Sequence, residues 1–519
     1  MSNRSSPVLR PMVPALLISA AAVALAPAAR ADAVTDWNEY SVAATKGWNG
    51  TSGIGVALDT NVSSRIDAIE ARAVFDAINS VEHFSKGSYY YDGSHTGSAS
   101  GAAAQAAHDV LLAQLPNPTL DPSANPGWTE TRNWLDARLA EYLKALGVAA
   151  SDGGIAAGKA AALAASNARL LDNASPATTY GAQLVPTSNP GVGVWRQSNA
   201  GPGVINPATG APTGFDAAGV MLPRPGAALN WRDLLPFSLT QRQIAALVAD
   251  VPLSPRVGSV QYRLELEYVR KHGQDSAPAR LRSADQTAQA LYYKQDGEIF
   301  VNEVARIAAT ARHSTLLENA ALFALLDNAI ADTRHAAFAS KYEQKFWRPI
   351  TALNADADGA VRNDYASWRP LAATPAHPSN TSGHSATGAA GAEVLRVYFG
   401  SDRIVPDGSA VVLGSLPWLV GVNQGTGNVT TRSVSTLSEM QLENGASRLY
   451  LGVHYGTDNY QGQVLGLAVA DAILHSDDPA ASGLKPLRVS YPGSPENLEA
   501  TLARDPETYG YFGRARKRD

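Results

Sequence analysis

Three residues at the start of one predicted helix have the chemistry to bind an anion and exchange a proton with it. Ser382, Gly383 and His384 follow the stretch PAHPSNT and precede SATGAAGAEVLRVYFG, a run of helix-forming residues that closes on Gly400. Ser382 stands where an N-cap residue is expected, so the Gly383 N–H points out of the helix start toward any anion. The His384 imidazole can exchange a proton near neutral pH. A purely structural role, with Ser382 as a cap and His384 as an ordinary first-turn residue, explains the same pattern.

Two cationic residues, Lys341 and Arg348, lie seven positions apart in the stretch KYEQKFWRP. Seven residues span about two helical turns, roughly 10 Å, which places both side chains on one face where they can converge on a small anion. Pro349 disfavours helix at Arg348, so we expect the helix to end there. Phe346 and Trp347 would then wall off a dry anion site. Two solvated charges on an exposed face would give the same spacing.

A third cluster, in SRLYLGVHYGTDN, supplies Arg448, His454 and Asp458. Arg448 adds a third cation, and His454 offers a ring nitrogen that can serve as a ligand or a nucleophile. Asp458 could accept a hydrogen bond from the other ring nitrogen of His454, or it could cap the next helix. No set of three or four ligands at metal-site spacing accompanies this histidine, so the metal signal from the residues alone is weak.

These clusters need helices to position them, and the periodicity of the chain is mostly helical. Apolar residues recur at three- and four-residue spacing over 65–84 and 317–347. Thr436 and Glu439 indicate a capping box before a further helix, which the apolar run 463–474 follows. Few segments alternate like strands, so the sequence predicts an all-α protein.

One large helical domain is expected over residues 32–519, with a catalytic core at about 317–475. A stretch rich in Pro, Gly, Asn and Ser, between about Asp172 and Trp231, is too long for an ordinary connection, but the composition does not shift across it. Small residues after His384 would let another helix approach closely, which predicts that this helix start is interior. They are Ala386, Gly388, Ala389 and Gly391.

The first 31 residues have the order of a secretory signal peptide. Arg4 and Arg10 precede an apolar stretch, and an A-x-A cleavage motif precedes Asp32. An uncleaved membrane anchor is the alternative, which two prolines in the segment disfavour. We therefore expect a secreted or periplasmic protein that has no membrane association after signal removal. The balance of 42 basic against 47 acidic residues argues against nucleic acid as a partner, and the absence of cysteine excludes disulfides and thiolate metal sites.

Together the three clusters resemble the signature of the superfamily that joins vanadium-dependent haloperoxidases with type 2 phosphatidic acid phosphatases and bacterial acid phosphatases. The matching pattern is Lys, six residues, Arg-Pro; then Ser-Gly-His; then Arg, five residues, His, three residues, Asp, over 341–458. Upstream, DWNEY, ARAVFDAIN and GVWR resemble secreted bacterial haloperoxidase-like proteins. The resemblance implies a large helical-bundle domain of the haloperoxidase and acid phosphatase type.

The resemblance also implies a role for each matching residue. The residue matching His454 binds vanadium axially or attacks phosphorus, and the residue matching His384 acts as acid and base. With vanadate as cofactor, Lys341 would polarise bound hydrogen peroxide, and a halide, with bromide or iodide favoured, would be oxidised to hypohalous acid. His377 matches the position where brominating algal enzymes carry His and a chlorinating fungal enzyme carries Phe, although a histidine in a Pro-rich turn needs no such role. A tetrahedral oxyanion would be held by Lys341, Arg348, Ser382, Gly383 and Arg448.

Three functions are consistent with this sequence. The first is a vanadate-dependent haloperoxidase, favoured by the length of the chain, the upstream likeness and the absence of later membrane-spanning segments. The second is a secreted acid phosphatase that acts on a small phosphate ester through a phosphohistidine at His454. The third is a non-catalytic anion-binding helical protein, which the presence of both His384 and His454 disfavours. A homo-oligomer is compatible with each of them.

Overall fold

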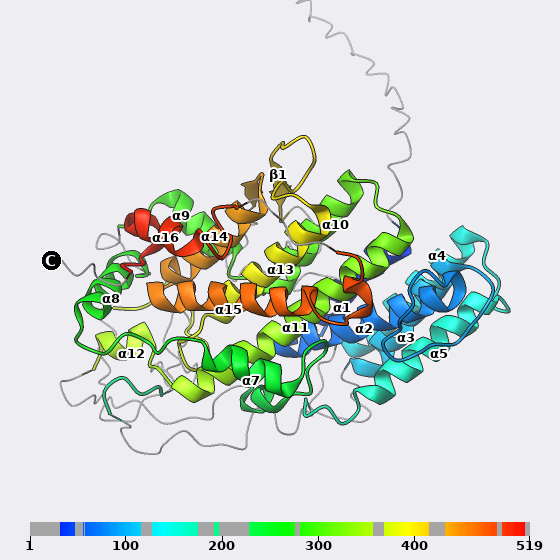
Figure 1. The fold of residues 1–519 in the computed structure, drawn as a ribbon, viewed down its shortest axis with the longest axis horizontal. Coiled ribbons are helices and arrows are strands. Elements are labelled where there is room, and N and C mark those ends of the chain that lie inside the picture. The colour runs from blue at the N-terminus through cyan, green and yellow to red at the C-terminus, as the bar shows by residue number, and fades with distance from the viewer. Residues whose placement is uncertain are drawn as a thin grey trace, which may run out of the picture.

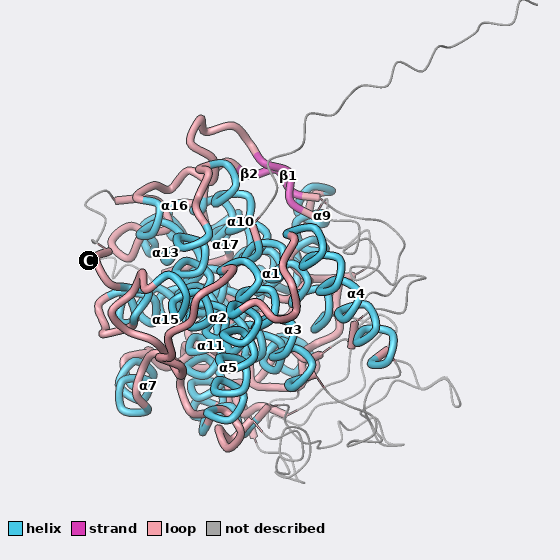
Figure 2. The backbone as a smooth tube through the Cα atoms, turned by 90° about the vertical axis from the view of Figure 1, so that its right-hand side faces the viewer, coloured by secondary structure: helices cyan, strands magenta, loops and turns pink. Residues whose placement is uncertain are grey.

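The computed structural model describes residues 32–46, 55–56, 58–115, 127–174, 191–196, 228–275, 281–355, 368–414, 431–484 and 490–513. Within these ranges the chain is mostly helical, with one small antiparallel sheet (Figures 1 and 2), so the all-α prediction is confirmed. The expected signal peptide at 1–31 lies outside the described residues, as does most of the stretch between Asp172 and Trp231.

The helices before the 175–190 gap gather toward one end of the molecule, at the right of Figure 1. α2, α3 and α5 pack against one another, α1 packs on α2 and α3, and α4 packs on α3. Their bounds are α1 Ala33–Lys46, α2 Thr60–Glu82, α3 Ala99–Gln114, α4 Trp128–Leu146 and α5 Gly153–Ala168.

The later helices surround α11, which contacts α2, α13 and α15. The strands β1 (Val411–Leu413) and β2 (Arg432–Val434) pair antiparallel, with Val412 opposite Ser433. The remaining elements are η1 Leu229–Asp233, α7 Gln241–Ala249, α8 Val260–His272, α9 Ala284–Tyr292, α10 Gly297–Ala311, α11 Leu316–Gln344, α12 Pro349–Leu353, α13 Gly383–Phe399, α14 Leu437–Tyr450, α15 Gly456–Leu474, η3 Pro479–Ala481, α16 Leu498–Arg504 and α17 Pro506–Tyr509.

The helix α11 is the central element because it is buried on nearly every side. Its apolar residues belong to a core that extends from α1 to α15. A helix that is buried all round is typical of the centre of a large bundle. Two helical predictions are therefore confirmed, since α11 covers most of 317–347 and α2 covers most of 65–84.

The predicted helix caps at the site are present. The Ser382 hydroxyl accepts a hydrogen bond from the Ser385 amide at 3.3 Å, and α13 ends at Gly400 with φ of 65°. The capping box at the start of α14 forms as predicted, with Thr436 and Glu439 each accepting from the backbone amide of the other. These caps fix where α13 and α14 begin, and hence where the residues of the site lie.

The start of α13 is interior, as its small residues predict. A Cβ added to Gly462 on α15 would lie 2.4 Å from the Ser382 carbonyl oxygen, and one added to Gly466 would lie 2.1 Å from the Ala386 carbonyl oxygen. On other faces of α13, a Cβ at Gly391 would lie 2.4 Å from a Val301 methyl group of α10. Helix backbones can approach this closely only where a side chain is absent.

The prediction that the Lys341 helix continues to Arg348 is wrong. α11 ends at Gln344, and Lys345 caps it in the left-handed conformation with φ of 49°. Arg348 is instead the N-cap of α12, with Pro349 in the first turn. Proline is well suited to the first turn of a helix, so here it begins one helix rather than ending another. A turn, not a shared helix face, brings Lys341 and Arg348 together.

Candidate active site

Three segments meet at the predicted anion site: the turn after α11, the loop that leads into α13, and the connection between α14 and α15. Backbone hydrogen bonds hold them together. The Ser379 amide donates to the Phe346 carbonyl at 2.9 Å, and the Ser382 amide donates to the Asp458 carbonyl at 3.0 Å. The three sequence clusters are therefore neighbours in space.

The Lys341 ammonium group is fully buried and faces the loop before α13. Its Nζ donates to the carbonyl oxygens of Pro378 and Ser379, each at 3.1 Å, and to that of Thr381. Burial and the nearby Arg348 guanidinium hold the pKa of Lys341 well below its usual range. Lys341 thus fixes the loop that presents Ser382, while it contributes positive charge to the site.

The Arg348 guanidinium connects the α13 loop with the residues before α15. Its Nε donates to the His377 carbonyl at 3.0 Å and its Nη1 donates to the Val453 carbonyl at 2.6 Å. Nη1 also lies 3.0 Å from Nε2 of His454, and Nη2 lies 3.0 Å from Nδ1 of His377. Arg348 is fully buried, and burial lowers its pKa to about 10.

His454 is held by a buried carboxylate. Its Nδ1 lies 3.0 Å from Oδ2 of Asp458, and the same oxygen accepts from the Ser379 hydroxyl at 2.5 Å and the Tyr455 amide at 3.1 Å. Both alternatives for Asp458 therefore hold in the structure, because the carboxylate contacts the ring and also accepts an amide at the start of α15. With a proton on Nδ1, the lone pair of Nε2 faces the Arg348 guanidinium.

The electrostatics at His454 favour the neutral ring. The imidazole is 2% exposed. Burial, followed by the positive charges of Arg348, Lys341 and Arg448, holds the pKa of His454 well below its ordinary range. A neutral imidazole that is oriented by a carboxylate can act as a ligand or a nucleophile through Nε2.

His384 and Arg448 both contact the segment between α9 and α10. Nε2 of His384 is 3.2 Å from the Gln295 carbonyl oxygen. Burial and the cations Arg448 and Arg334 hold the pKa of His384 well below its ordinary value. Nη1 of Arg448 donates to the Tyr293 carbonyl at 3.1 Å, while its Nε is buried without a partner in the described part of the chain.

Aromatic residues enclose the side of the site near the turn after α11. Phe346 and Trp347 are 9% and 3% exposed, and they belong to a cluster with Tyr262 of α8 and Tyr455. The ring centroids of Phe346 and Tyr455 are 5.5 Å apart. The predicted apolar wall is thus in contact with the residues that precede α15.

Sequence reasoning missed Arg334 and Gln295. Arg334 lies on α11 seven residues before Lys341 and is 3% exposed. Its spacing from Lys341 equals that between Lys341 and Arg348, so the same periodicity could have found it. Gln295 lies between α9 and α10, and no spacing relates it to the predicted site.

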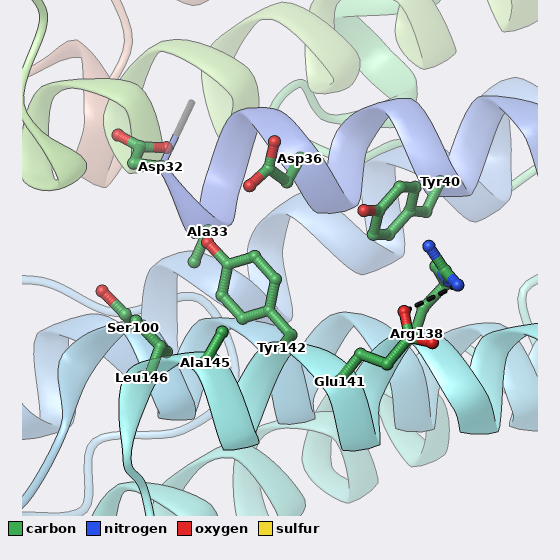
Figure 3. A pocket seen from close by; sticks show the side chains of 10 residues that line it. All are labelled: Asp32, Ala33, Asp36, Tyr40, Ser100, Arg138, Glu141, Tyr142, Ala145 and Leu146. Carbon is green, nitrogen blue, oxygen red and sulfur yellow. Dashed lines mark ion pairs between the residues drawn. The ribbon is translucent and has the colours of Figure 1, made fainter. Parts of the chain in front are cut away.

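The cavity drawn in Figure 3 lies elsewhere, between α1, the start of α3 and α4. It has a volume of about 510 Å³, and an ion pair of 2.7 Å between Arg138 and Glu141 crosses its edge. None of the predicted site residues lines it.

The described ranges show neither a cluster of metal-ligating side chains nor a helix suited to span a membrane. These residues contain no group of three or more His, Cys, Asp or Glu side chains arranged to hold a metal ion. Among the same residues, no helix combines the length and the apolar character needed to cross a membrane.

Comparison with known proteins relates this site to one family. Residues 321–479 match the family model of the VCPO second helical-bundle domain. The vanadium chloroperoxidase of Curvularia inaequalis is 31% identical over a match that covers 34% of this chain and 37% of that protein. This chain therefore spans little more than a third of the length of that relative.

Solved structures extend the likeness of fold to most of the chain. A bacterial vanadium-dependent iodoperoxidase superposes with a TM-score of 0.61 at 18% identity, covering 88% of this chain and 98% of the other. A holo-type bacterial vanadium-dependent chloroperoxidase gives 0.60 at 17% identity, covering 86% and 98%. The fold is that of the helical-bundle vanadium haloperoxidases. The sequence match over 321–479 falls within this shared fold and contains all three clusters of the predicted site.

Proposed function

We propose that this protein is a vanadate-dependent haloperoxidase, which uses hydrogen peroxide to oxidise a halide to hypohalous acid. One observation carries the proposal: a buried, neutral His454, oriented by Asp458, faces a cluster of buried cations. Such a cluster is costly in a folded protein unless an anion compensates it. The match of the same residues to the VCPO domain model supports vanadate as the oxyanion.

The donor groups of the site fit a tetrahedral oxyanion. Arg448 keeps a buried Nε without a partner among the described residues. Gly383 is the first residue of α13, so its amide has no acceptor within the helix. The Ser382 hydroxyl accepts from Ser385, which leaves its own proton free to donate. Together with Lys341 and Arg348, these residues would hold vanadate, and Nε2 of His454 would ligate it.

In the proposed reaction, the cofactor would activate peroxide, and residues of this chain would transfer protons and stabilise charge. Bound vanadate would supply the activation of peroxide toward halide. His384 is neutral in the anion-free site, so it can accept a proton from peroxide and later return one to the product. The ammonium of Lys341 would attract developing negative charge on the peroxide oxygens.

Bromide or iodide is the proposed halide. The support is His377, whose ring lies 5.0 Å from the Phe338 ring and whose Nδ1 lies 3.0 Å from Arg348. A polarisable halide suits a position between an aromatic ring and a guanidinium group. The relatives include both chloro- and iodoperoxidases, so the preference rests on this contact.

An acid phosphatase is the second candidate, because the same geometry at His454 would serve a nucleophile. The Asp458 carboxylate would orient the ring while Nε2 attacks the phosphorus of a small ester and displaces its alcohol, and water would then hydrolyse the phosphohistidine to phosphate. In that case the cations would stabilise the transferred phosphoryl group.

One experiment separates the two candidates. The purified protein is incubated with orthovanadate and assayed for peroxide-dependent oxidation of bromide and iodide, beside hydrolysis of a simple phosphomonoester without vanadate. We expect halide oxidation that depends on vanadate. Brisk ester hydrolysis that vanadate only inhibits, with no halide oxidation at any pH, would reverse the assignment.

We also propose that the protein is secreted or periplasmic and that residues 32–519 form one domain. The support for secretion is the order of charged, apolar and small residues in 1–31. Fractionation of the producing cells and N-terminal sequencing of the mature protein would test it, with Asp32 as the expected first residue.

A further inference from the structure

Arg334 is a buried cation whose environment differs from that of an ordinary structural arginine. It lies on α11, is 3% exposed, and donates from Nε to the Oδ1 of Asn61 at 2.9 Å. Asn61 is in the first turn of α2, and its side chain is buried as well. A helix from the N-terminal half of the chain therefore fixes the direction of this guanidinium.

The guanidinium of Arg334 reaches the anion site. A Cβ added to Gly383 would lie 2.9 Å from Nη1 of Arg334 and 3.9 Å from Cε of Lys341. Both cations thus pack against the residue whose amide opens α13. The charge of Arg334 also lowers the pKa values of His384, Lys341 and Arg448, which is the expected effect of a nearby cation.

The described part of the chain does not satisfy this guanidinium. Within it, Arg334 forms no ion pair within 4.0 Å, although its charge lowers the pKa of the buried Glu298, and its single hydrogen bond uses Nε. Its ring contact with Phe338, at 5.4 Å from the centroid, leaves the edges of the guanidinium free. An arginine has five N–H donors, and a buried one with so few partners indicates that an anionic ligand supplies the others.

We propose that Arg334 is a fourth cation of the oxyanion site and that Asn61 is the positioning residue that aims it. Arg334 would donate through Nη1 or Nη2 to an oxygen of the bound oxyanion, next to the Gly383 amide. This inference rests on the proposed function, since it assumes that the site binds vanadate or a similar tetrahedral anion. It adds Arg334 of α11, aimed by Asn61 of α2, to a set of proposed oxyanion-binding residues that otherwise lies within 341–454.

The first test measures anion binding by the full-length protein without an activity assay. Equilibrium dialysis with orthovanadate, and thermal shift with sulfate, are applied to wild type, Arg334→Gln and Arg334→Lys. A hydrogen bond between charged groups is typically stronger than a neutral one, so we expect Arg334→Gln to weaken binding about ten- to a hundred-fold. Arg334→Lys should recover part of the affinity, because it keeps the charge but loses the bond to Asn61.

Asn61→Asp tests the positioning role. It places a carboxylate against Nε of Arg334, so the new ion pair should preserve the melting temperature of the anion-free protein while it competes with the oxyanion for the guanidinium. We expect weaker binding of vanadate and sulfate with no loss of stability. A residue that serves only the fold would show the opposite pattern, with affinity unchanged.

Arg72→Gln is the matched control. Arg72 is another buried arginine that bonds an asparagine across the same two helices, and its guanidinium has other protein partners. Its substitution should leave anion affinity unchanged. Normal vanadate binding by Arg334→Gln and Asn61→Asp, with wild type also binding, would overturn the role of Arg334 alone. Failure of wild type to bind vanadate would instead overturn the proposed function.

Discussion

Two arginine–asparagine pairs cross the interface between α2 and α11, and they differ in what surrounds the guanidinium. Arg72 of α2 donates from Nε to Oδ1 of Asn328 on α11 at 2.6 Å. Its Nη1 and Nη2 donate to the Tyr90 hydroxyl at 2.9 Å and the Ser238 hydroxyl at 3.1 Å, and the group lies 4.3 Å from the Tyr89 ring centroid.

The other pair has the reverse order, with Arg334 on α11 and Asn61 on α2. Here the bond from Nε is similar, at 2.9 Å, but the described residues offer no hydrogen-bond acceptor to Nη1 or Nη2. Because the two helices run antiparallel, the two pairs lie at different levels of one interface. The first guanidinium is satisfied by the protein and serves the fold. The second keeps its donors for a ligand, which marks the end of the interface that faces the site.

The largest effect on anion binding is expected from a substitution that removes the proposed vanadate ligand and leaves the hydrogen bond between Arg72 and Asn328 intact. His454→Ala removes the one imidazole that is held by Asp458, so stable retention of vanadate should be lost. The cations would still attract the anion weakly, and the helical circular dichroism should be unchanged. Vanadium content after extensive dialysis provides the measurement. Retention equal to that of wild type would show that another group ligates vanadium.

The next-largest effects are expected from two substitutions that distinguish proton transfer from anion binding. His384→Ala should reduce turnover about 10²- to 10⁴-fold, the usual contribution of general acid–base catalysis, while vanadate still binds. Arg448→Ala should weaken binding itself, because it removes the cation with an unpartnered Nε. Vanadate affinity and halide oxidation are measured for both variants. An affinity loss for His384→Ala as large as that for Arg448→Ala would show that the two residues do not have separate roles.

The comparison of the two pairs also predicts that the two substitutions reduce stability by different amounts. Arg72→Gln leaves buried acceptors without their donor, so we expect the free energy of unfolding to fall by about 3 kcal/mol. Arg334→Gln removes a cation that has no ion pair within 4.0 Å and a single hydrogen bond among the described residues, so the anion-free protein should lose much less. Urea denaturation of both variants in phosphate-free buffer tests this. Equal losses would mean that Arg334 has a structural role like that of Arg72.

The sequence predicted much of this site because its residues follow local rules. The helix caps at Ser382 and Thr436 and the buried face of α11 depend on short-range spacing, and each is present in the structure. The path from Lys341 to Arg348 was predicted incorrectly, because a left-handed Lys345 ends α11 and residues 193–195 pair with the turn. That pairing is a tertiary contact, which no local pattern reveals.

The two site residues that were not predicted, Arg334 and Gln295, also depend on tertiary contacts that local sequence patterns do not reveal. Arg334 has the right spacing from Lys341, but its partner Asn61 is 273 positions away in the sequence. The Gln295 carbonyl, which accepts from His384, has no side-chain signature at all. Contacts of this kind depend on how α2, α10 and α11 pack, so only the folded structure could identify them.

The smallest expected effect is a fractional uptake of protons when an anion enters the site. In the anion-free protein, burial and the charges of Arg448, Arg334 and Lys341 hold the pKa of His384 well below its ordinary value, although the hydrogen bond to the Gln295 carbonyl opposes them. A bound dianion offsets these cations, so the pKa should rise on binding.

At pH values between the pKa of His384 in the anion-free protein and its higher pKa in the complex, each binding event should therefore take up part of a proton. The affinity for the anion should accordingly increase as the pH falls through this range. Sulfate is the suitable probe because it carries no titrating proton near neutral pH. Calorimetry at pH 6 in buffers of different ionisation enthalpy gives the number of protons. Arg72→Gln should match wild type, whereas His384→Ala should show less uptake, with a remainder from His377 and His454, whose pKa values the same cations lower. Unchanged uptake in His384→Ala would place the proton on one of those rings instead.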